Sequence, residues 1–385
     1  MKKDDPYLGF ELGPIRPPSE ASSLLLRITR NCPWNRCKFC HLYKGEKFSI
    51  RPVDHVIQDI DKIHHYVSAL QQIREQVSTD TGLQEEITQQ SRQSESEMMA
   101  FQSAMNWFHS GMESIFLQDA NNLAVKPDRL IAILHHIQER FPQVIRVTTY
   151  ARSKSVARIS DENMARIANA GLNRIHIGME SAADEVLDFI KKGVDKETHI
   201  LAGRKVKQAG IQLSEYFMPG LGGEKFSKQN ALETADAVNQ IDPDFIRIRT
   251  LGIPNNTELF KDCQAGTFAQ LGDRGMAGEL LMFLENLHGI TSTVKSDHIL
   301  NLFQEVDGRF PGDKEKMISP IQKFLAMAPE EQMIYMVGRR AGILPTLAHM
   351  DHSHLRQQVE QVIRQHQITL DNVEYITAEI MKQFI

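Results

Sequence analysis

The chain has 385 residues, of which 41% are hydrophobic and 24% are charged, and its formal net charge is −5. These values are typical of a globular protein that buries a sizeable core, in one large domain with an appendage or in two domains. The net negative charge gives no indication of a basic surface that would bind nucleic acid or an anionic membrane. No apolar run approaches the roughly 20 residues that a membrane helix needs. We therefore expect neither nucleic acid nor a membrane among its partners.

The N-terminal segment carries no recognisable targeting signal. It begins Met-Lys-Lys-Asp-Asp, and no apolar core segment of a signal peptide follows. With no secretory signal and only four cysteines, a reducing cytoplasm is the expected location. Residues 1–22 contain four prolines and predict an extended N-terminal lead-in.

Three of the four cysteines, Cys32, Cys37 and Cys40, lie within nine residues, directly after an apolar, strand-like run at residues 24–28. Three thiolates this close, with no fourth cysteine nearby, suit an iron–sulfur cluster that keeps one iron open for another molecule. A structural zinc site is an alternative, but it needs a fourth ligand, and only the adjacent His41 is near. A disulfide with one spare thiol is the other alternative.

The middle of the chain alternates between strand and helix patterns. Pro52 begins a predicted helix. Residues 66–110 predict a helical insertion, and its Gln-, Glu- and Ser-rich part is expected to be exposed to solvent. Beyond it, apolar strand-like runs alternate with amphipathic helices. Together with residues 24–28, the predicted strands are 114–118, 144–151, 173–180, 211–220 and 244–254.

Six strands, each but the last followed by a helix, predict right-handed βαβ units and hence an α/β fold with a parallel sheet. Such a sheet either closes most of a barrel or lies open and doubly wound. From about residue 256 helical stretches dominate, so residues 256–385 are predicted to form a helical C-terminal domain.

The cysteine loop resembles that of the radical S-adenosylmethionine (SAM) superfamily, whose usual signature is CxxxCxxC with an aromatic residue before the last cysteine. Phe39 fills the aromatic position, but four residues rather than three separate Cys32 from Cys37, which indicates an enlarged loop. The pattern is most similar to the coproporphyrinogen-oxidase-like and elongator-like branch. The resemblance covers roughly residues 20–255, and it implies a partial six-stranded parallel (β/α)6 TIM-like barrel at residues 23–255.

The resemblance also implies a function. One [4Fe–4S] cluster on Cys32, Cys37 and Cys40 would bind SAM and cleave it reductively to a 5′-deoxyadenosyl radical, which abstracts hydrogen from a small organic substrate. An external flavodoxin- or ferredoxin-type donor would supply the electron. An anaerobic tetrapyrrole enzyme of the coproporphyrinogen oxidase type is the alternative within the superfamily, although Leu42 stands where those enzymes place a further cysteine. A non-catalytic iron–sulfur electron-transfer or sensor protein is the alternative outside it.

Candidate SAM contacts follow from the same resemblance. Gln118 and Asp119 stand where the family often has a GGE-like motif for the SAM ammonium group, although an Asx turn also explains Asp119. Gly-Met-Glu-Ser at residues 178–181 resembles a step that coproporphyrinogen oxidases use at SAM, and Lys192 falls where they carry a basic residue. Lys192 also has a plain explanation as a cap at a helix end. The full set of candidates is Tyr150, Arg152, Glu180, Ser181 and Lys192 for the carboxylate and ribose, and Phe39, Met218 and Leu251 for the adenine.

Candidate substrate contacts come from the last two predicted strands. Arg247 and Arg249 share one face of their strand and predict a site for a substrate carboxylate or phosphate. Tyr216 on the preceding strand is a further candidate. The alternative is that the arginines pair with Glu215. Asp297 and His298 are candidates to reach this site from the C-terminal domain, although a lone histidine of that kind is usually structural.

Overall fold

The computed structural model describes residues 6–75 and 81–384. Residues 1–5 of the predicted lead-in, residues 76–80 of the predicted insertion and residue 385 lie outside the described residues. One eight-stranded sheet has the order β1-β4-β5-β6-β7-β8-β9-β10, and β2 and β3 form a separate antiparallel pair. The strands are β1 Leu24–Arg27, β2 Thr29–Arg30, β3 Ser49–Ile50, β4 Ser114–Gln118, β5 Arg146–Ala151, β6 Arg174–Glu180, β7 Gln212–Phe217, β8 Phe245–Ile248, β9 Thr293–Lys295 and β10 Gly308–Arg309.

The prediction of an α/β fold on a mostly parallel sheet is confirmed, and all six predicted strands are present as β1, β4, β5, β6, β7 and β8. The expected count of six needs one correction. The short strands β9 and β10 extend the sheet, and they come from the predicted helical C-terminal domain, in which no strand was expected. Strands of three and two residues are too short to show an alternating pattern in the sequence.

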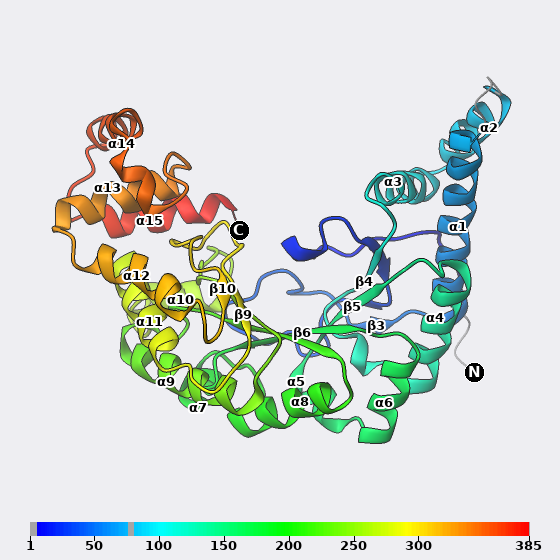
Figure 1. Ribbon diagram of the computed structural model, residues 1–385, viewed down its shortest axis with the longest axis horizontal. Helices are drawn as coiled ribbons and strands as arrows, with labels where there is room; N and C mark the ends of the chain where they lie inside the picture. The colour runs from blue at the N-terminus through cyan, green and yellow to red at the C-terminus, as the bar shows by residue number, and fades with distance from the viewer. Residues whose placement is uncertain (1–5, 76–80, 385) are drawn as a thin grey trace. The chain divides into compact units, whose positions relative to one another are not determined.

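Helices fill the connections between the successive parallel strands of the sheet (Figure 1). Their starts follow ordinary capping rules: Pro127 begins α4, and the Ser160 hydroxyl accepts a hydrogen bond from the Asn163 N–H at the start of α6. The helices are α1 Val53–Glu75, α2 Thr81–Ser91, α3 Glu95–His109, α4 Pro127–Arg140, α5 Ser153–Arg158, α6 Asp161–Asn169, α7 Asp184–Phe189, α8 Lys196–Gln208, α9 Gly223–Ile241, α10 Glu258–Gln264, α11 Asp273–Glu285, α12 Lys314–Leu325, α13 Pro329–Arg340, α14 Ser353–Gln365 and α15 Val373–Met381.

The chain divides into two compact units. The first comprises residues 1–33, 45–176 and 205–212, and the second comprises residues 34–44, 177–204 and 213–385. The predicted domain boundaries at residues 22 and 255 stay predictions.

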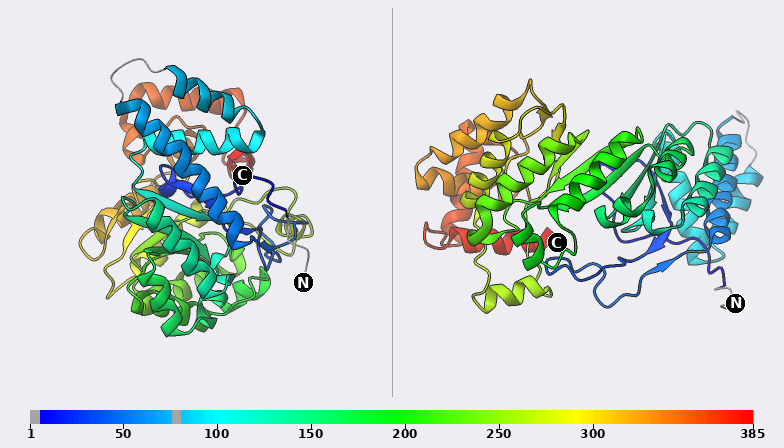
Figure 2. Two further views of the ribbon diagram at one scale, coloured as in Figure 1. Left: turned by 90° about the vertical axis from the view of Figure 1, so that its right-hand side faces the viewer. Right: turned by 90° about the horizontal axis from the view of Figure 1, so that it is seen from below.

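In the first unit, β4 pairs in parallel with β1 on one side and β5 on the other. The long helix α1 lies against both α3 and α4, as Figures 1 and 2 show. Trp107 of α3 and Phe141 are buried together, with ring centroids 4.9 Å apart, so the helical insertion is packed onto the core of this unit.

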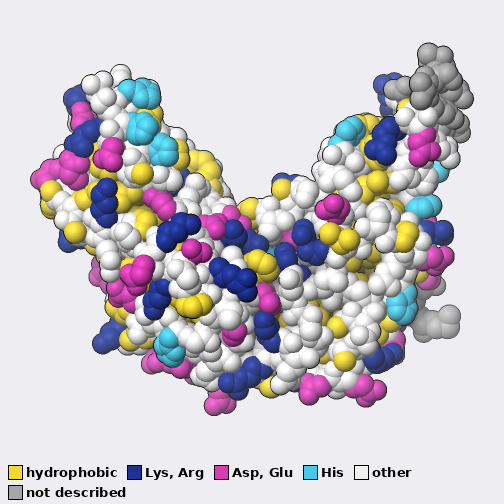
Figure 3. All heavy atoms as spheres, in the orientation of Figure 1, with side chains coloured by type: hydrophobic (Ala, Val, Ile, Leu, Met, Phe, Trp, Pro, Cys, Tyr) yellow, Lys and Arg dark blue, Asp and Glu magenta, His cyan; other side chains and the backbone are white. Residues whose placement is uncertain are grey.

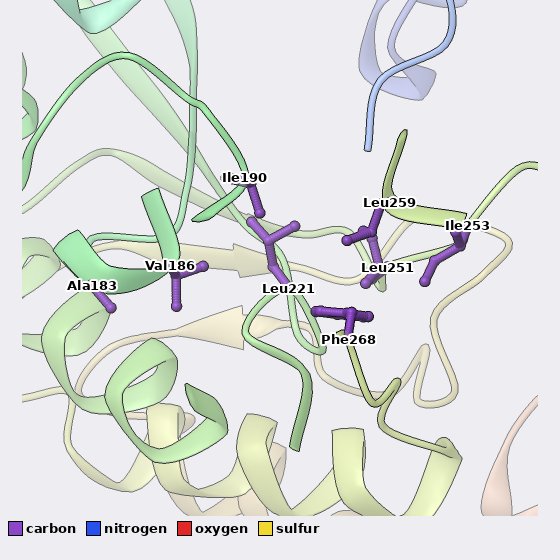
Figure 4. Close-up of a cluster of buried hydrophobic side chains, with 8 residues drawn as sticks. All are labelled: Ala183, Val186, Ile190, Leu221, Leu251, Ile253, Leu259 and Phe268. Carbon is purple, nitrogen blue, oxygen red and sulfur yellow. The ribbon is translucent and has the colours of Figure 1, made fainter. Parts of the chain in front are cut away.

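In the second unit, β8 lies between β7 and β9 in parallel pairings, and β10 is antiparallel to β9. Helix α11 packs on α9 and α12, and α13 packs on α14 and α15. An apolar cluster joins the start of α7 to the loops after β7 and β8 and to α10 (Figure 4). Its buried members are Ala183, Val186, Ile190, Leu221, Leu251, Ile253, Leu259 and Phe268.

None of the helices within residues 6–75 and 81–384 combines the length and the apolar character that crossing a membrane would require.

Candidate active site

The three clustered cysteines are partly buried thiols. Cys32 belongs to the first unit, whereas Cys37 and Cys40 belong to the second. Within the described part of the chain, no group of three or more His, Cys, Asp or Glu side chains is arranged as ligands of one metal ion. The donor set nevertheless fits an iron–sulfur cluster, because such clusters are held by thiolates and the chain supplies three within nine residues.

In the first unit, Asp119 fixes the chain just before Cys32. Its Oδ2 accepts hydrogen bonds from Arg27 Nε at 3.0 Å, from Arg27 Nη2 at 2.8 Å and from the Asn31 N–H at 3.3 Å. Asp119 is buried, so this pair is formed largely out of water. The sequence analysis did not single out Arg27 as a partner of Asp119. Its position as a charged residue at the end of an apolar strand could have indicated such a role.

Gln118 ties the N-terminal segment to the end of β4. Its side-chain oxygen accepts from the Gly13 N–H at 2.9 Å, and its amide donates to the Ile15 carbonyl at 2.7 Å. The Gln118 carbonyl accepts from the Ile28 N–H at 2.5 Å. The side chain is therefore engaged with the protein's own backbone, and only its carbonyl lies at the strand end.

Two asparagines after β4, which the sequence analysis did not single out, brace the neighbouring strand ends. The Asn122 side chain accepts from the Thr29 hydroxyl at 2.8 Å and donates to the Thr149 hydroxyl at 2.9 Å. Asn121 Oδ1 accepts from the Arg152 N–H at 3.0 Å. The Asn-Asn pair directly after an apolar strand is the signal that could have found them.

Tyr150 lies near the end of β5, and its ring packs at 5.2 Å from the Phe116 ring and 5.6 Å from the His176 ring. Arg152 follows as the N-cap of α5. In the first unit, Asp119 and Arg152 therefore lie at the ends of neighbouring strands, and the hydrogen bond from the Arg152 N–H to Asn121 links these two ends. Tyr150 is part of an aromatic group.

In the second unit, the loop at residues 34–44 is fastened to α7 and α10. The Lys38 N–H donates to the Ile190 carbonyl at 2.9 Å, and the Lys38 carbonyl accepts from the Leu259 N–H at 3.0 Å. The Lys38 ammonium pairs with Asp262 at 2.8 Å and lies 4.2 Å from the centroid of the Phe189 ring. Lys38 thus anchors the segment between two of the cysteines by both its backbone and its side chain.

Trp34 holds the start of the same loop. Its Nε1 donates to the Lys191 carbonyl at 2.7 Å, and its ring lies directly over Gly193. Gly193 has φ +71°, and a Cβ there would overlap the Trp34 ring. Glycine is therefore required at this position for both its backbone conformation and its lack of a side chain.

Several predicted SAM contacts lie together in the second unit. Glu180, which ends β6, forms an ion pair with Lys192. The Lys192 ammonium lies 5.9 Å from the centroid of the Phe39 ring, beside the last cysteine. The Glu180 carbonyl accepts from the Met218 N–H at 2.8 Å. Phe39, Glu180, Lys192 and Met218 are therefore neighbours although they are far apart in sequence.

Ser181 and Leu251 make structural contacts in this unit. The buried Ser181 hydroxyl accepts from the Ala183 N–H at 3.1 Å, just before α7. Leu251 belongs to the apolar cluster, and its N–H donates to the Pro219 carbonyl at 3.0 Å. Phe39 and Met218 pack against the same cluster, so an apolar surface borders the cysteine loop.

Arg247 and Arg249 both pair with Asp297. Arg247 Nη1 lies 2.5 Å from Asp297 Oδ2, and Arg249 Nη1 lies 3.2 Å from Asp297 Oδ1. The Arg249 guanidinium also lies 5.1 Å from the centroid of the Tyr216 ring. The strand register places Tyr216 beside Arg247 and Glu215 beside Ile246, so the arginines do not share a face with Glu215.

Two titratable groups of this region have shifted pKa values: Glu215, buried in β7, and His298, half-buried beyond β9. Burial raises the pKa of Glu215 well above its usual range, although the positive charge of Lys192 opposes this effect. Burial, and then the charge of Arg249, lower the pKa of His298 to about 4, so this histidine is neutral at pH 7.

Glu279 supports the loop after β7 and had no role in the sequence analysis. Its Oε1 accepts from the Gly220 N–H at 2.9 Å and from Asn230 Nδ2 at 2.6 Å. Burial raises its pKa to about 7. The sequence signal is its spacing, three residues after Met276 and four before Phe283, which places a charge on the apolar face of α11.

Comparison with known protein families finds a match in the middle of the chain. Residues 93–235 match the family model for the Radical SAM superfamily. A radical SAM domain is therefore present within residues 93–235 of the chain. The resemblance inferred from the cysteine loop is thereby confirmed, and the matched residues do not include that loop. Members of this superfamily are enzymes that use a [4Fe–4S] cluster and SAM. The prediction of an enzyme and the prediction of these two cofactors are therefore confirmed.

Two archaeal tRNA uridine(34) acetyltransferases are similar to part of this radical SAM chain. The protein from Methanocaldococcus infernus is 26% identical over 110 residues, which are 28% of this chain and 21% of that protein. The protein from Methanocaldococcus jannaschii is 24% identical over 109 residues, which are 28% of this chain and 20% of that protein. The match therefore spans about a fifth of the length of these relatives.

Solved structures resemble the chain over larger parts but with low identity. The N-terminally truncated Elp3 of Methanocaldococcus infernus matches with a TM-score of 0.41 and 15% identity, over 52% of this chain and 53% of that one. Coproporphyrinogen III oxidase from Escherichia coli matches with a TM-score of 0.43 and 12% identity, over 68% and 52% of the two chains.

Proposed function

We propose that Cys32, Cys37 and Cys40 hold the [4Fe–4S] cluster of this radical SAM enzyme, and that the enzyme abstracts hydrogen from a small organic substrate. When bound and reduced, the cluster supplies the electron that cleaves SAM to methionine and a 5′-deoxyadenosyl radical. One observation carries the proposal: three thiols within nine residues directly follow the first strand of a chain that matches the superfamily model.

In the second unit, Lys192 is the residue that we propose for the SAM carboxylate. It is nearly buried and stands beside Phe39, and its pairing with Glu180 keeps its ammonium group oriented. A carboxylate ligand at this ammonium would gain a charge-assisted hydrogen bond. Glu180 and Ser181 are proposed for the ribose, and Phe39, Met218 and Leu251 for the adenine, because Phe39 and Met218 pack against the apolar cluster that contains Leu251.

In the first unit, Asp119 and the Gln118 carbonyl are proposed for the SAM ammonium group. Asp119 is already paired with Arg27, so its carboxylate is oriented before any ligand arrives. Tyr150 and Arg152 are proposed as further polar contacts from the next strand end. An external electron donor of the flavodoxin or ferredoxin type completes the proposal.

A small substrate is favoured over tRNA, the substrate named for the archaeal relatives. The match to those relatives spans only about a fifth of their length, and the net charge of this chain is −5. On the face drawn in Figure 3, Lys and Arg side chains are interspersed with Asp and Glu side chains. Binding to a nucleic-acid backbone depends on clustered basic residues. A tetrapyrrole remains the alternative small substrate.

The test is anaerobic reconstitution of the whole chain, followed by iron and sulfide analysis and a SAM-cleavage assay. The wild-type protein should bind about four irons and four sulfides and form 5′-deoxyadenosine with dithionite and SAM. Cys32→Ser, Cys37→Ser and Cys40→Ser should each lose both properties, whereas Cys263→Ser, the matched control, should keep them. A cluster that survives all three substitutions would refute the assignment.

A separate arm of the same assay tests the substrate class. Added tRNA should leave the rate of 5′-deoxyadenosine formation unchanged. A rate that rises severalfold with tRNA, but not with small organic molecules, would refute the small-substrate proposal and leave the cluster assignment intact.

A further inference from the structure

Two arginines that share a single acid stand out among the polar groups of the second unit. Arg247 and Arg249 both pair with Asp297, and Asp297 is the one carboxylate paired with either of them in the described part of the chain. Arg247 is only 4% exposed, so its charge has been taken almost completely out of water. The cluster therefore holds two positive charges and one negative charge.

The surplus positive charge is not balanced by its other neighbours. His298 is neutral at pH 7, because burial and the charge of Arg249 hold its pKa at about 4. Tyr216 offers the face of its ring to Arg249, and Ser214 accepts from Arg247 Nε at 3.2 Å, but neither contributes a negative charge. An uncompensated buried charge is costly, so an anion bound here would stabilise the protein.

The geometry favours a carboxylate as that anion. Asp297 contacts the Nη1 atom of each arginine. A guanidinium group carries five N–H donors, so each arginine has further donors for a second acceptor. Two guanidinium forks match the two oxygens of a carboxylate. A single carboxylate group, including one end of a dicarboxylic acid such as succinate, carries one negative charge and so balances the one surplus charge of the cluster.

We propose that Arg247, Arg249 and Asp297 form the recognition site for a carboxylate of the substrate, so that the substrate of this enzyme is a small organic acid. This inference deepens the proposed function and rests on it, since it names the class of molecule from which hydrogen is taken.

Asp297 has a definite part in this site. It is 28% exposed at its side chain, more than either arginine, so it lies on the solvent side of the cluster. In the absence of substrate, it neutralises part of the charge and keeps the two forks together. A bound carboxylate shares the arginines with Asp297 or displaces it, and the acid is therefore a competitor of the substrate.

The experiment is isothermal titration calorimetry on the reconstituted holoenzyme, with succinate and inorganic phosphate as probes at constant ionic strength. Wild-type protein should bind succinate more tightly than phosphate. Arg247→Met and Arg249→Met should weaken succinate binding at least about tenfold, since a hydrogen bond to a charged group contributes about 1.5–3 kcal/mol. Arg249→Lys, which keeps the charge but loses the fork, should fall between wild type and Arg249→Met.

Asp297→Asn gives the sharpest outcome because it removes the competitor. Succinate should bind this variant several times more tightly than wild type, and its melting temperature should rise more steeply with succinate than that of wild type. Arg364→Gln, at an exposed arginine of α14, is the matched control and should leave succinate binding unchanged. A purely structural role for the cluster predicts weaker stability in Asp297→Asn with no gain in anion affinity.

The outcomes separate this inference from the proposed function. Normal 5′-deoxyadenosine formation with no succinate binding, or with equal loss in Arg364→Gln, would overturn the carboxylate site and leave the radical SAM assignment in place. Tighter binding of phosphate than succinate would overturn the choice of carboxylate. Succinate binding that follows the predicted order of variants, in protein that cannot cleave SAM, would support the anion site and refute the proposed function.

Discussion

Replacement of Glu279 by glutamine should change how the stability of the protein depends on pH. Glu279 is 2% exposed, and its Oε1 accepts hydrogen bonds from the Gly220 N–H and from Asn230. Its pKa is raised by burial from the usual 4.5 to about 7. Because the folded protein holds this proton more tightly than the unfolded chain, the stabilisation is complete below about pH 4.5 and is lost as pH rises through about 7.

The size of the effect follows from the two pKa values. Their difference corresponds to about 3 kcal/mol in total, and most of it is lost between pH 5 and pH 8. Glutamine keeps an oxygen that can accept both hydrogen bonds but does not titrate. The free energy of unfolding of Glu279→Gln should therefore lack this fall.

The assay is urea unfolding of the apo chain with reduced thiols, followed by circular dichroism at pH 5, 6, 7 and 8. The difference in unfolding free energy between wild type and Glu279→Gln should shift by about 2–3 kcal/mol across this range, in favour of the variant at high pH. Glu285→Gln, at an exposed residue of the same helix, is the control and should run parallel to wild type. Parallel curves for Glu279→Gln would refute the reasoning.

Two further substitutions test how the cysteine loop is held. In urea unfolding, Gly193→Ala should destabilise the protein by about 1–3 kcal/mol more than the control Gly266→Ala. Both glycines have φ near +70°, but only at Gly193 would an added Cβ overlap the Trp34 ring. Equal losses of stability in the two variants would show that the Trp34 contact contributes nothing. Asp119→Asn removes the buried negative charge that pairs with Arg27 and should cost about 3–5 kcal/mol, whereas Asp128→Asn, at the exposed pair with Arg166, should cost less than about 1 kcal/mol. Equal, small losses in the two variants would show that the Asp119–Arg27 pair contributes little to stability.

The regular part of the fold could be predicted from the sequence because its signals are local. Runs such as Ser-Ile-Phe-Leu-Gln at residues 114–118 are apolar and bounded by helix patterns, and they are strands in the structure. The strands β9 and β10 escaped prediction because they have only three and two residues, and their pairing is decided by neighbours far away in the chain. Local pattern cannot report such long-range pairings.

The polar partners show the same limit. That Arg247 and Arg249 would share a face follows from strand periodicity, but their common partner is Asp297, about fifty residues further on. The sequence suggested Glu215 as their partner, but the register of β7 against β8 places Glu215 beside Ile246 instead, and the pairing with Asp297 was not predicted. Glu279 was missed for a different reason: an acid within an apolar helix face is informative only when burial is weighed residue by residue.

Electron paramagnetic resonance of the reduced, reconstituted protein, recorded with and without SAM, tests most directly whether the three thiols leave an iron open for SAM. The account predicts the signal of a reduced [4Fe–4S] cluster that changes when SAM is added, and its loss in Cys37→Ser but not in Cys263→Ser. A cluster signal that is identical with and without SAM, or no cluster signal at all in anaerobic wild-type protein, would contradict it.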